Sequence, residues 1–188
     1  ISAQDRHLIL HPEAAKIECI PNGIDASFFE ELSCIKTHDF VFVGNMSYAP
    51  NIVAVQYIHD NILPHFPNSS LLVSGSSPTA KLLKLAEKSE QMEITGWVDD
   101  IRLSYLQGKI FVAPMMIGTG MQNKLLEAMA LGVPCITTPL ANSPIKTSHN
   151  KEILVAKNEA EFVLAINRLL ADKKLYQEIS ENAKDFVK

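Results

Sequence analysis

The sequence predicts a doubly wound α/β domain, in which helices cover both faces of a parallel sheet. Short runs of β-branched and aromatic residues alternate with longer segments of helical periodicity along the 188 residues. The first three runs are apolar on both faces rather than alternating, as expected of strands that helices cover on both sides. Because 47% of the residues are hydrophobic, the chain can bury one sizeable core, and one domain of ordinary size is expected.

The individual elements follow from local patterns. Residues 51–63 carry apolar side chains at 52, 55, 58 and 62, which is close to helical period. Near the end, Asn158 and Glu161 form a capping-box-like start to a docking helix that implies no chemistry. Near the beginning, "PNG" indicates a turn after a short strand. The predicted strands are 40–44, 71–75, 92–96, 109–114, 134–138 and 152–156, with helices at 51–63, 78–88, 99–106 and within 118–132.

Composition excludes several classes of function. The net charge is −4 and the 17 Lys and Arg residues are scattered, so nucleic acid is not an expected partner. No apolar run approaches the roughly 20 residues of a spanning helix, and no signal peptide is recognisable, which predicts a cytoplasmic protein. The three cysteines form no C-x-x-C pair, so neither a disulfide framework nor a metal site is indicated. The chain opens at Ile1 without a methionine and closes inside a helical pattern, which suggests a piece of a longer protein.

The strongest functional signal is the stretch "GTGMQNKLLEAMALG", residues 118–132. Ligands of open α/β sheets bind beyond the carboxyl ends of the strands, and this stretch follows the fourth predicted strand. Gly118 and Gly120 allow a close backbone approach, and the helix that begins immediately afterwards points its free N–H groups at the loop. The occupant that this arrangement favours is an anion, most commonly a phosphate.

Lys124 and Glu127 are the only charged residues between Ile110 and Ile145. Glu127 is expected about 10 Å along the helix from Gly120, which is near the distance from a diphosphate to a ribose. A carboxylate can accept hydrogen bonds from both ribose hydroxyls, while Lys124 would lie nearer the phosphates. The alternative is an exposed Lys–Glu pair at i, i+3 that contributes a few tenths of a kcal/mol. The apolar surroundings favour the ligand site, because burying unpaired charges costs several kcal/mol.

The glycine spacing alone is a weak signal. "GTG" lacks the third glycine of G-x-G-x-x-G, because Asn123 stands at that position, and no G-x-x-x-x-G-K-[ST] occurs in the chain. A nicotinamide dehydrogenase and a P-loop NTPase are therefore disfavoured.

Four motifs together resemble a known family. "IPNGIDASFF", "FVGNMSYAPN", "GWVDD" and "GTGMQNKLLEAMALGVPCITT" occur in this order. Their order and spacing are similar to the C-terminal half of retaining glycosyltransferases of the GT-B fold, family GT4, from about Ile20 to the end. The resemblance implies a Rossmann-like donor-binding domain at 37–188 and, at 1–36, a linker from a missing N-terminal acceptor domain of the same chain.

The resemblance also implies the roles of particular residues. The donor would be a nucleotide-diphosphate sugar, usually UDP- or GDP-linked, with Glu127 on the ribose. Amides of residues 118–121 would hold the diphosphate, and the base would lie against the loop of Trp97 and Val98. The donor-binding residues so predicted are Gly44, Asn45, Gly75, Trp97, Val98, Gly118, Thr119, Gly120, Met121, Gln122, Lys124 and Glu127.

The implied reaction is transfer of a hexosyl group to a saccharide or lipid-linked acceptor. It would proceed with retention of configuration and without a metal or another cofactor. No nucleophile stands near residues 118–127, so no catalytic residue is assigned. The full-length protein is expected to be the glycosyltransferase, and this chain alone is expected to be inactive.

Several positions depart from the family pattern. Many relatives carry a glutamate eight positions before the ribose glutamate, where this chain has Thr119. Many also have cations after the first strand, where this chain has Asn45, Met46 and Ser47, and an arginine where Met116 stands. Neutralisation of the diphosphate would thus depend on Lys124, the helix N-terminus and the missing half. Weak donor binding or lost activity is the consequence to test.

Two other functions stay open at this point. A degenerate, non-catalytic sugar-nucleotide-binding module fits the departures, and a sugar-nucleotide epimerase would bind the same ligand but needs acid/base residues. Trp97 fits a base-stacking residue and a core residue equally well. The lysine face of helix 78–88 leaves a peripheral membrane contact open, whereas its interleaved glutamates favour a solvated surface.

Overall fold

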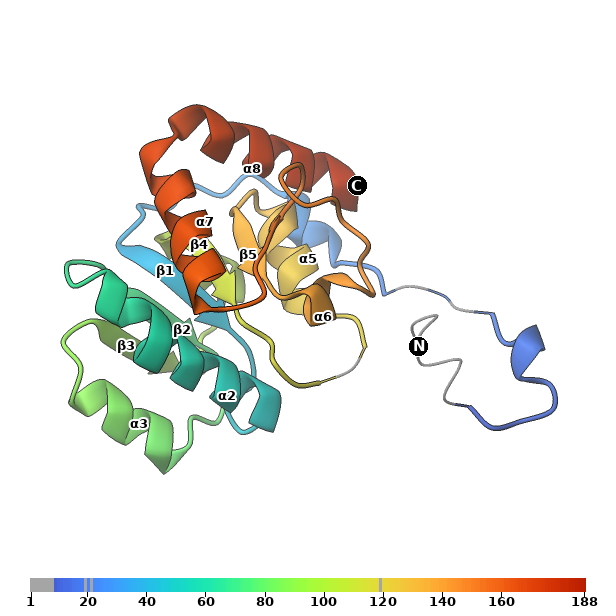
Figure 1. Cartoon of the computed structure of the whole chain (residues 1–188), viewed down its shortest axis with the longest axis horizontal. Coiled ribbons are helices and arrows are strands. Elements are labelled where there is room, and N and C mark those ends of the chain that lie inside the picture. Colours follow the sequence, from blue (N-terminus) through green and yellow to red (C-terminus); the bar gives the residue numbers. More distant parts are fainter. Residues whose placement is uncertain (1–8, 19, 21, 119) are drawn as a thin grey trace.

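A computed structural model describes residues 9–18, 20, 22–118 and 120–188 of the chain. Its centre is a six-stranded sheet in the order β3-β2-β1-β4-β5-β6 (Figure 1). Every neighbouring pair of strands is parallel. The predicted doubly wound α/β fold is therefore confirmed. The strands are β1 His38–Val43, β2 Leu71–Ser74, β3 Met92–Gly96, β4 Gly108–Ala113, β5 Cys135–Thr137 and β6 Leu154–Val155.

The helices follow the predicted segments with shifted ends. The helix predicted at 51–63 is α2 Ala49–Tyr57, which continues through a π-helical turn at Ile58–Ile62 and a 3-10 turn at Leu63–His65. α7 begins with the predicted capping-box-like pair: Asn158 Oδ1 accepts from the Glu161 amide at 3.0 Å, while Glu161 Oε2 accepts at 2.8 Å from the amide of Lys157, one residue before the N-cap. The others are α3 Ala80–Glu87, α4 Ile101–Gln107, α5 Asn123–Ala130, α6 Pro139–Asn142, α7 Glu159–Ala171 and α8 Lys173–Val187.

The two helical layers follow from the strand order. The chain moves outward from β1 to β3 and then returns across the sheet to β4. Because parallel crossovers are right-handed, α2 and α3 lie on one face and α4 and α5 on the other. α7 returns to the first face, where it contacts the end of the α2 segment, and it lies with α2 on the nearer side in Figure 1. The sheet is thus covered on both faces.

One strand departs from the predicted burial. β1, β2 and β4 are buried along most of their length, as expected of strands between two helical layers. β3 instead alternates, with Met92 buried and Glu93 and Thr95 exposed. The prediction that 92–96 is apolar on both faces is wrong, because β3 is an edge strand of the sheet. The predicted strand 152–156 shrinks to the two residues of β6.

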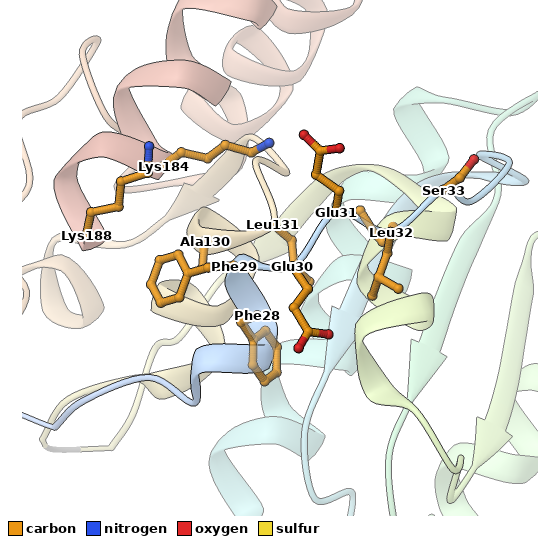
Figure 2. A pocket seen from close by; sticks show the side chains of 11 residues that line it. Phe28, Phe29, Glu30, Glu31, Leu32, Ser33, Ala130, Leu131, Lys184 and Lys188 are labelled. Carbon is orange, nitrogen blue, oxygen red and sulfur yellow. The ribbon is translucent and has the colours of Figure 1, made fainter.

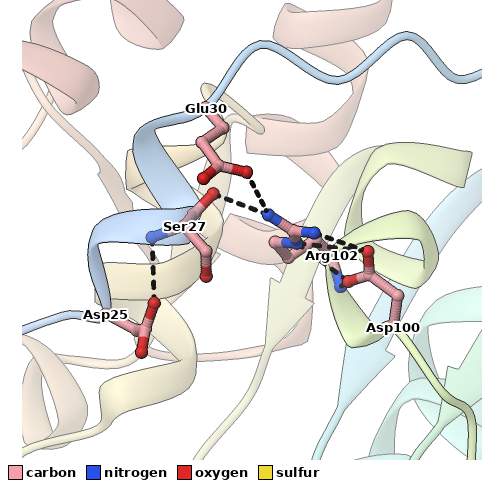
Figure 3. Close-up of polar contacts among 5 residues, drawn as sticks. All are labelled: Asp25, Ser27, Glu30, Asp100 and Arg102. Atoms are coloured by element: carbon pink, nitrogen blue, oxygen red, sulfur yellow. Dashed lines mark hydrogen bonds and ion pairs between the residues drawn. The ribbon is translucent and has the colours of Figure 1, made fainter.

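Arg102 makes several of the contacts that join the segment before β1 to the domain (Figure 3). Arg102 on α4 donates to the Ser27 carbonyl at 2.9 Å and to Glu30 at 3.0 Å, and it is paired with Asp100 at 2.8 Å. The 3-10 helix η2, Ala26–Phe29, places Phe28 edge-on against Tyr105, with ring centroids 6.3 Å apart. The short strand predicted before "PNG" is absent from residues 9–18 and 20, while Cys19 and Pro21 lie outside the described residues.

Within the described residues, no helix is both long and apolar enough to cross a membrane. The lysines of α3 are solvent-exposed, as are Glu87 and Glu90 beside them.

Candidate functional site

The strand order places a topological switch point between β1 and β4, and open α/β sheets form a crevice outside the carboxyl ends of the strands at such a point. β1 and β4 are neighbours, but the chain leaves them toward opposite faces. At such a switch point the loops that follow the two strands diverge and leave room for a ligand beyond the carboxyl ends. Here these loops are 44–48 after β1 and 114–122 after β4.

Two glycines bring the loops after β1 and β2 into contact. A Cβ at Gly75, whose φ is +133°, would lie 1.9 Å from the Gly44 carbonyl oxygen. A Cβ at Gly44 would lie 2.6 Å from Asn51 Nδ2. Because real Cβ contacts of this length do not occur, Gly75 requires glycine, and a larger residue at Gly44 would have to displace the buried Asn51 side chain. The structure therefore gives these two glycines a role in backbone approach, whatever binds beside them.

A cavity of about 250 Å³ opens beside these glycines. Its lining brings together Gly44, Gly75, Trp97 and Val98, which the sequence places in three separate loops. Trp97 is 71% exposed, so the interpretation of Trp97 as a core residue is wrong. The remaining lining residues are Val43, Ser76 and Ile101.

The glycine-containing loop leads into α5. Gly118 and Gly120 have φ values of +110° and +83°, which only glycine adopts readily. α5 begins at Asn123, so the helix starts later than the sequence suggested. The side chain of its N-cap residue, Gln122, makes no capping hydrogen bond, which leaves amides and the positive end of the helix dipole available at this end of α5. Met121 and Gln122 are half-buried in this loop, and Thr119 lies outside the described residues.

Lys124 lies in the crevice between the two layers. Its ammonium donates to Asn51 Oδ1 and sits 5.2 Å from the centre of the Phe42 ring. Asn51 is only 3% exposed, and its Nδ2 donates to the Asn45 carbonyl at 2.8 Å. Lys124 thereby connects α5 to α2 and to the loop after β1. Burial lowers the pKa of Lys124 to about 8, and the negative charge of Glu127 partly opposes this shift.

The lowered pKa predicts a pH-dependent stability. Between pH about 8 and the ordinary 10.5, the unfolded chain holds a proton on Lys124 that the folded chain has released. Stability should therefore rise with pH through this window, by at most about 3 kcal/mol. Urea unfolding at both ends of the window should show the rise in the wild type and in Lys84→Met, an exposed-lysine control. Lys124→Met should lack it, and an equal rise in Lys124→Met would contradict the assignment.

Glu127 is half-buried on α5 and is held by a tyrosine. Its Oε2 accepts a hydrogen bond of 2.6 Å from the hydroxyl of Tyr105 on α4. No hydrogen bond within the described residues reaches its Oε1. The ion pairs among the described residues also do not join Glu127 to Lys124, so the interpretation of the two as a simple surface pair is wrong. The two groups are instead held separately, each by its own partner.

The structure also adds residues that the sequence did not reveal. Tyr105 and Asn51 hold the two charged groups, and both come from other helices than α5. In the sequence, Tyr105 and Asn51 are distinguished only as residues with a polar group within predicted helices that are otherwise largely apolar on one face. Asn45, by contrast, was predicted as a binding residue, and its side-chain oxygen accepts from the Ser47 amide at 2.9 Å within its own loop.

A second cavity, of about 690 Å³, lies away from this crevice (Figure 2). It is lined by the segment Phe28–Ser33, by residues at or just after the ends of α4 and α5, by Lys184 of α8, and by Lys188, which follows α8. The helices are antiparallel to the strands, so the carboxyl ends of the helices lie at the edge of the sheet where the strands begin. Ligands of parallel sheets bind at the other edge, which favours the crevice over this cavity.

The doubly wound sheet, with its switch point between β1 and β4, defines an α/β domain of the kind that forms half of a GT-B fold. Residues 37–172 match the family model described as Glycosyl transferases group 1. The chain belongs to this family, and the predicted GT4 resemblance is confirmed.

Known proteins agree with this assignment. The chain is 28% identical over 189 residues to UDP-Gal:alpha-D-GlcNAc-diphosphoundecaprenol alpha-1,3-galactosyltransferase of Escherichia coli, covering 88% of this chain and 48% of the relative. Its fold is similar to that of sucrose-phosphate synthase from Thermosynechococcus elongatus, with a TM-score of 0.79 and 16% identity; the match covers 100% of this chain and 52% of the synthase. The fold is also similar to that of Anabaena HepE in complex with UDP, with a TM-score of 0.71 and 13% identity; the match covers 88% of this chain and 51% of HepE. The chain thus spans about half of each of these proteins.

Proposed function

We propose that this chain is the donor-binding domain of a retaining glycosyltransferase. It holds a nucleotide-diphosphate sugar while a hexosyl group passes to a saccharide or lipid-linked acceptor. The observation that supports this most is the position of Glu127. In a chain of the glycosyl transferases group 1 family, one oxygen of this carboxylate has no hydrogen-bond partner among the described residues, one turn along a helix whose N-cap side chain makes no capping bond.

The crevice offers a place for each part of the donor. The diphosphate would lie on the amides of residues 118–121 and on the start of α5, where the helix dipole favours an anion. The ribose would lie at Glu127, further along the helix. The base would enter the cavity of about 250 Å³ beside Trp97 and Val98, with Gly44 and Gly75 at its wall.

UDP is the nucleotide we favour. The cavity lining contains no carboxylate and no side-chain amide, so the base would be read by backbone groups and by the face of Trp97. A guanine would leave its exocyclic amine without an acidic partner there. The named Escherichia coli relative acts on a UDP-sugar, and the Anabaena structure contains UDP.

The chain's own groups would stabilise the departing nucleotide. Negative charge develops on the diphosphate as the glycosidic bond breaks, and preorganised amides with Lys124 would stabilise that charge. Residues 1–36 would connect to the acceptor-binding domain, which supplies the remainder of the active site. Contact with a membrane would also belong to the full-length protein.

Calorimetric titration with UDP, GDP and ADP tests the proposal. UDP should bind with a dissociation constant near or below about 1 mM, and more tightly than GDP or ADP. Joining the chain to a second GT-B half that carries an acceptor site should then allow transfer from a UDP-sugar. Binding without transfer would favour the non-catalytic module, and the family match already disfavours the epimerase. The proposal fails if none of the three nucleotides binds at millimolar concentration.

A further inference from the structure

Tyr105 stands in an unusual position for a core residue. Its side chain is fully buried, yet its hydroxyl reaches the half-buried carboxylate of Glu127 at 2.6 Å. We propose that Tyr105 is a positioning residue, which fixes Glu127 so that the carboxylate can accept hydrogen bonds from two sugar hydroxyls. This inference rests on the proposed function.

The packing around Tyr105 leaves its hydroxyl little freedom. Its ring lies between Phe28, at 6.3 Å between centroids, and Phe111, at 5.4 Å. Burial, with the nearby charge of Glu127, raises the pKa of Tyr105 well above its ordinary value, so the hydroxyl keeps its proton and acts as the donor. A short bond from a neutral hydroxyl to a carboxylate is among the stronger protein hydrogen bonds.

The hydrogen bond determines how Glu127 can meet a ligand. A carboxylate has about four acceptor positions, and the tyrosine occupies one of them on Oε2. Oε1 and the outer lone pair of Oε2 remain for two neighbouring hydroxyls. Without Tyr105 the side chain of Glu127 could adopt other rotamers, and binding a diol would have to restrict them.

Tyr105 also connects two parts of the crevice. α4 begins at Ile101, which lines the cavity assigned to the base, and Tyr105 lies one turn further along the same helix. The hydrogen bond from Tyr105 to Glu127 therefore fixes the position of the Glu127 carboxylate, proposed to bind the ribose, relative to the cavity proposed to bind the base. A donor that occupies both parts would depend on this register.

A merely structural role would have a different signature. If the Tyr105 hydroxyl served only as a hydrogen-bond partner for a half-buried carboxylate, its removal would reduce stability and lower the affinity for every ligand equally. If it positions Glu127, the loss of affinity should require the ribose hydroxyls. UDP and 2′,3′-dideoxy-UDP, which differ only in those hydroxyls, separate the two cases.

The experiment measures both dissociation constants in the wild type, Tyr105→Phe and Tyr176→Phe. Tyr176 is the matched control, because its hydroxyl donates to the Lys109 carbonyl at 2.7 Å outside the crevice. Tyr105→Phe should weaken UDP about tenfold and dideoxy-UDP less than about twofold, while Tyr176→Phe changes neither. If Tyr105→Phe does not fold, 3-fluorotyrosine at position 105 should alter the affinity for UDP alone.

Three results would overturn the inference. Equal weakening of both nucleotides would show a structural role, and unchanged UDP affinity would show no role at all. Both results leave the proposed function intact. A wild-type chain that binds none of UDP, GDP and ADP would instead contradict the proposed function, and the inference with it.

Discussion

Replacing Glu127 by alanine should weaken UDP binding by about a hundredfold. The change removes both hydrogen bonds that the carboxylate is proposed to make to the ribose, each contributing about 1.5 kcal/mol because one partner is charged. It also leaves the buried Tyr105 hydroxyl without its acceptor, so the variant should lose about 1–3 kcal/mol of stability. Calorimetry measures the first effect and urea unfolding the second.

Two further variants make this result specific. Glu127→Gln keeps an oxygen for Tyr105, so it should retain most of the stability while still losing UDP affinity. Glu178→Ala removes an exposed glutamate on α8 and should change neither quantity. Unchanged UDP affinity in Glu127→Ala would remove the carboxylate from the donor site.

Replacing Gly75 by alanine should have the largest effect on stability, a loss of about 3–5 kcal/mol. The added Cβ would lie 1.9 Å from the Gly44 oxygen, and the φ of +133° suits no other residue. The ends of β1 and β2 would have to separate, which would open the sheet beside the proposed base cavity. Urea unfolding of the purified variant gives the loss directly, and loss of soluble expression would indicate an even larger effect.

Gly96→Ala is the matched control for this prediction. Gly96 also has a positive φ, of +70°, but a Cβ there meets nothing within 4 Å. Its substitution should therefore cost only the backbone strain, about 1–2 kcal/mol. If the two variants were destabilised equally, the close approach of Gly44 and Gly75 would not be what requires glycine.

Much of the fold could be predicted because it depends on local patterns. The apolar runs predicted β1, β2 and β4, and the pair Asn158 and Glu161 predicted the start of α7. The prediction that strand 92–96 is buried on both faces was wrong, because strand order depends on long-range contacts and β3 is an edge strand. β6 is shorter than the predicted strand 152–156 for the same reason, because it is the other edge strand and pairs only with β5.

The site divides in the same way. Lys124 and Glu127 stand out in the sequence because they are isolated charges in an apolar helix. Their partners do not stand out, because Asn51 lies 73 positions from Lys124 and Tyr105 lies 22 positions from Glu127. Only the packing of α2 and α4 against the sheet brings these groups together. The exposure of Trp97 likewise depends on its place after the edge strand.

A crystal structure of the chain with UDP would test the central claim most directly. We predict the ribose hydroxyls within about 3 Å of the Glu127 carboxylate, with the diphosphate at the start of α5. A nucleotide bound in the cavity of Phe28 and Lys184, at the other edge of the sheet, would contradict this account. So would a nucleotide in the crevice whose ribose points away from Glu127.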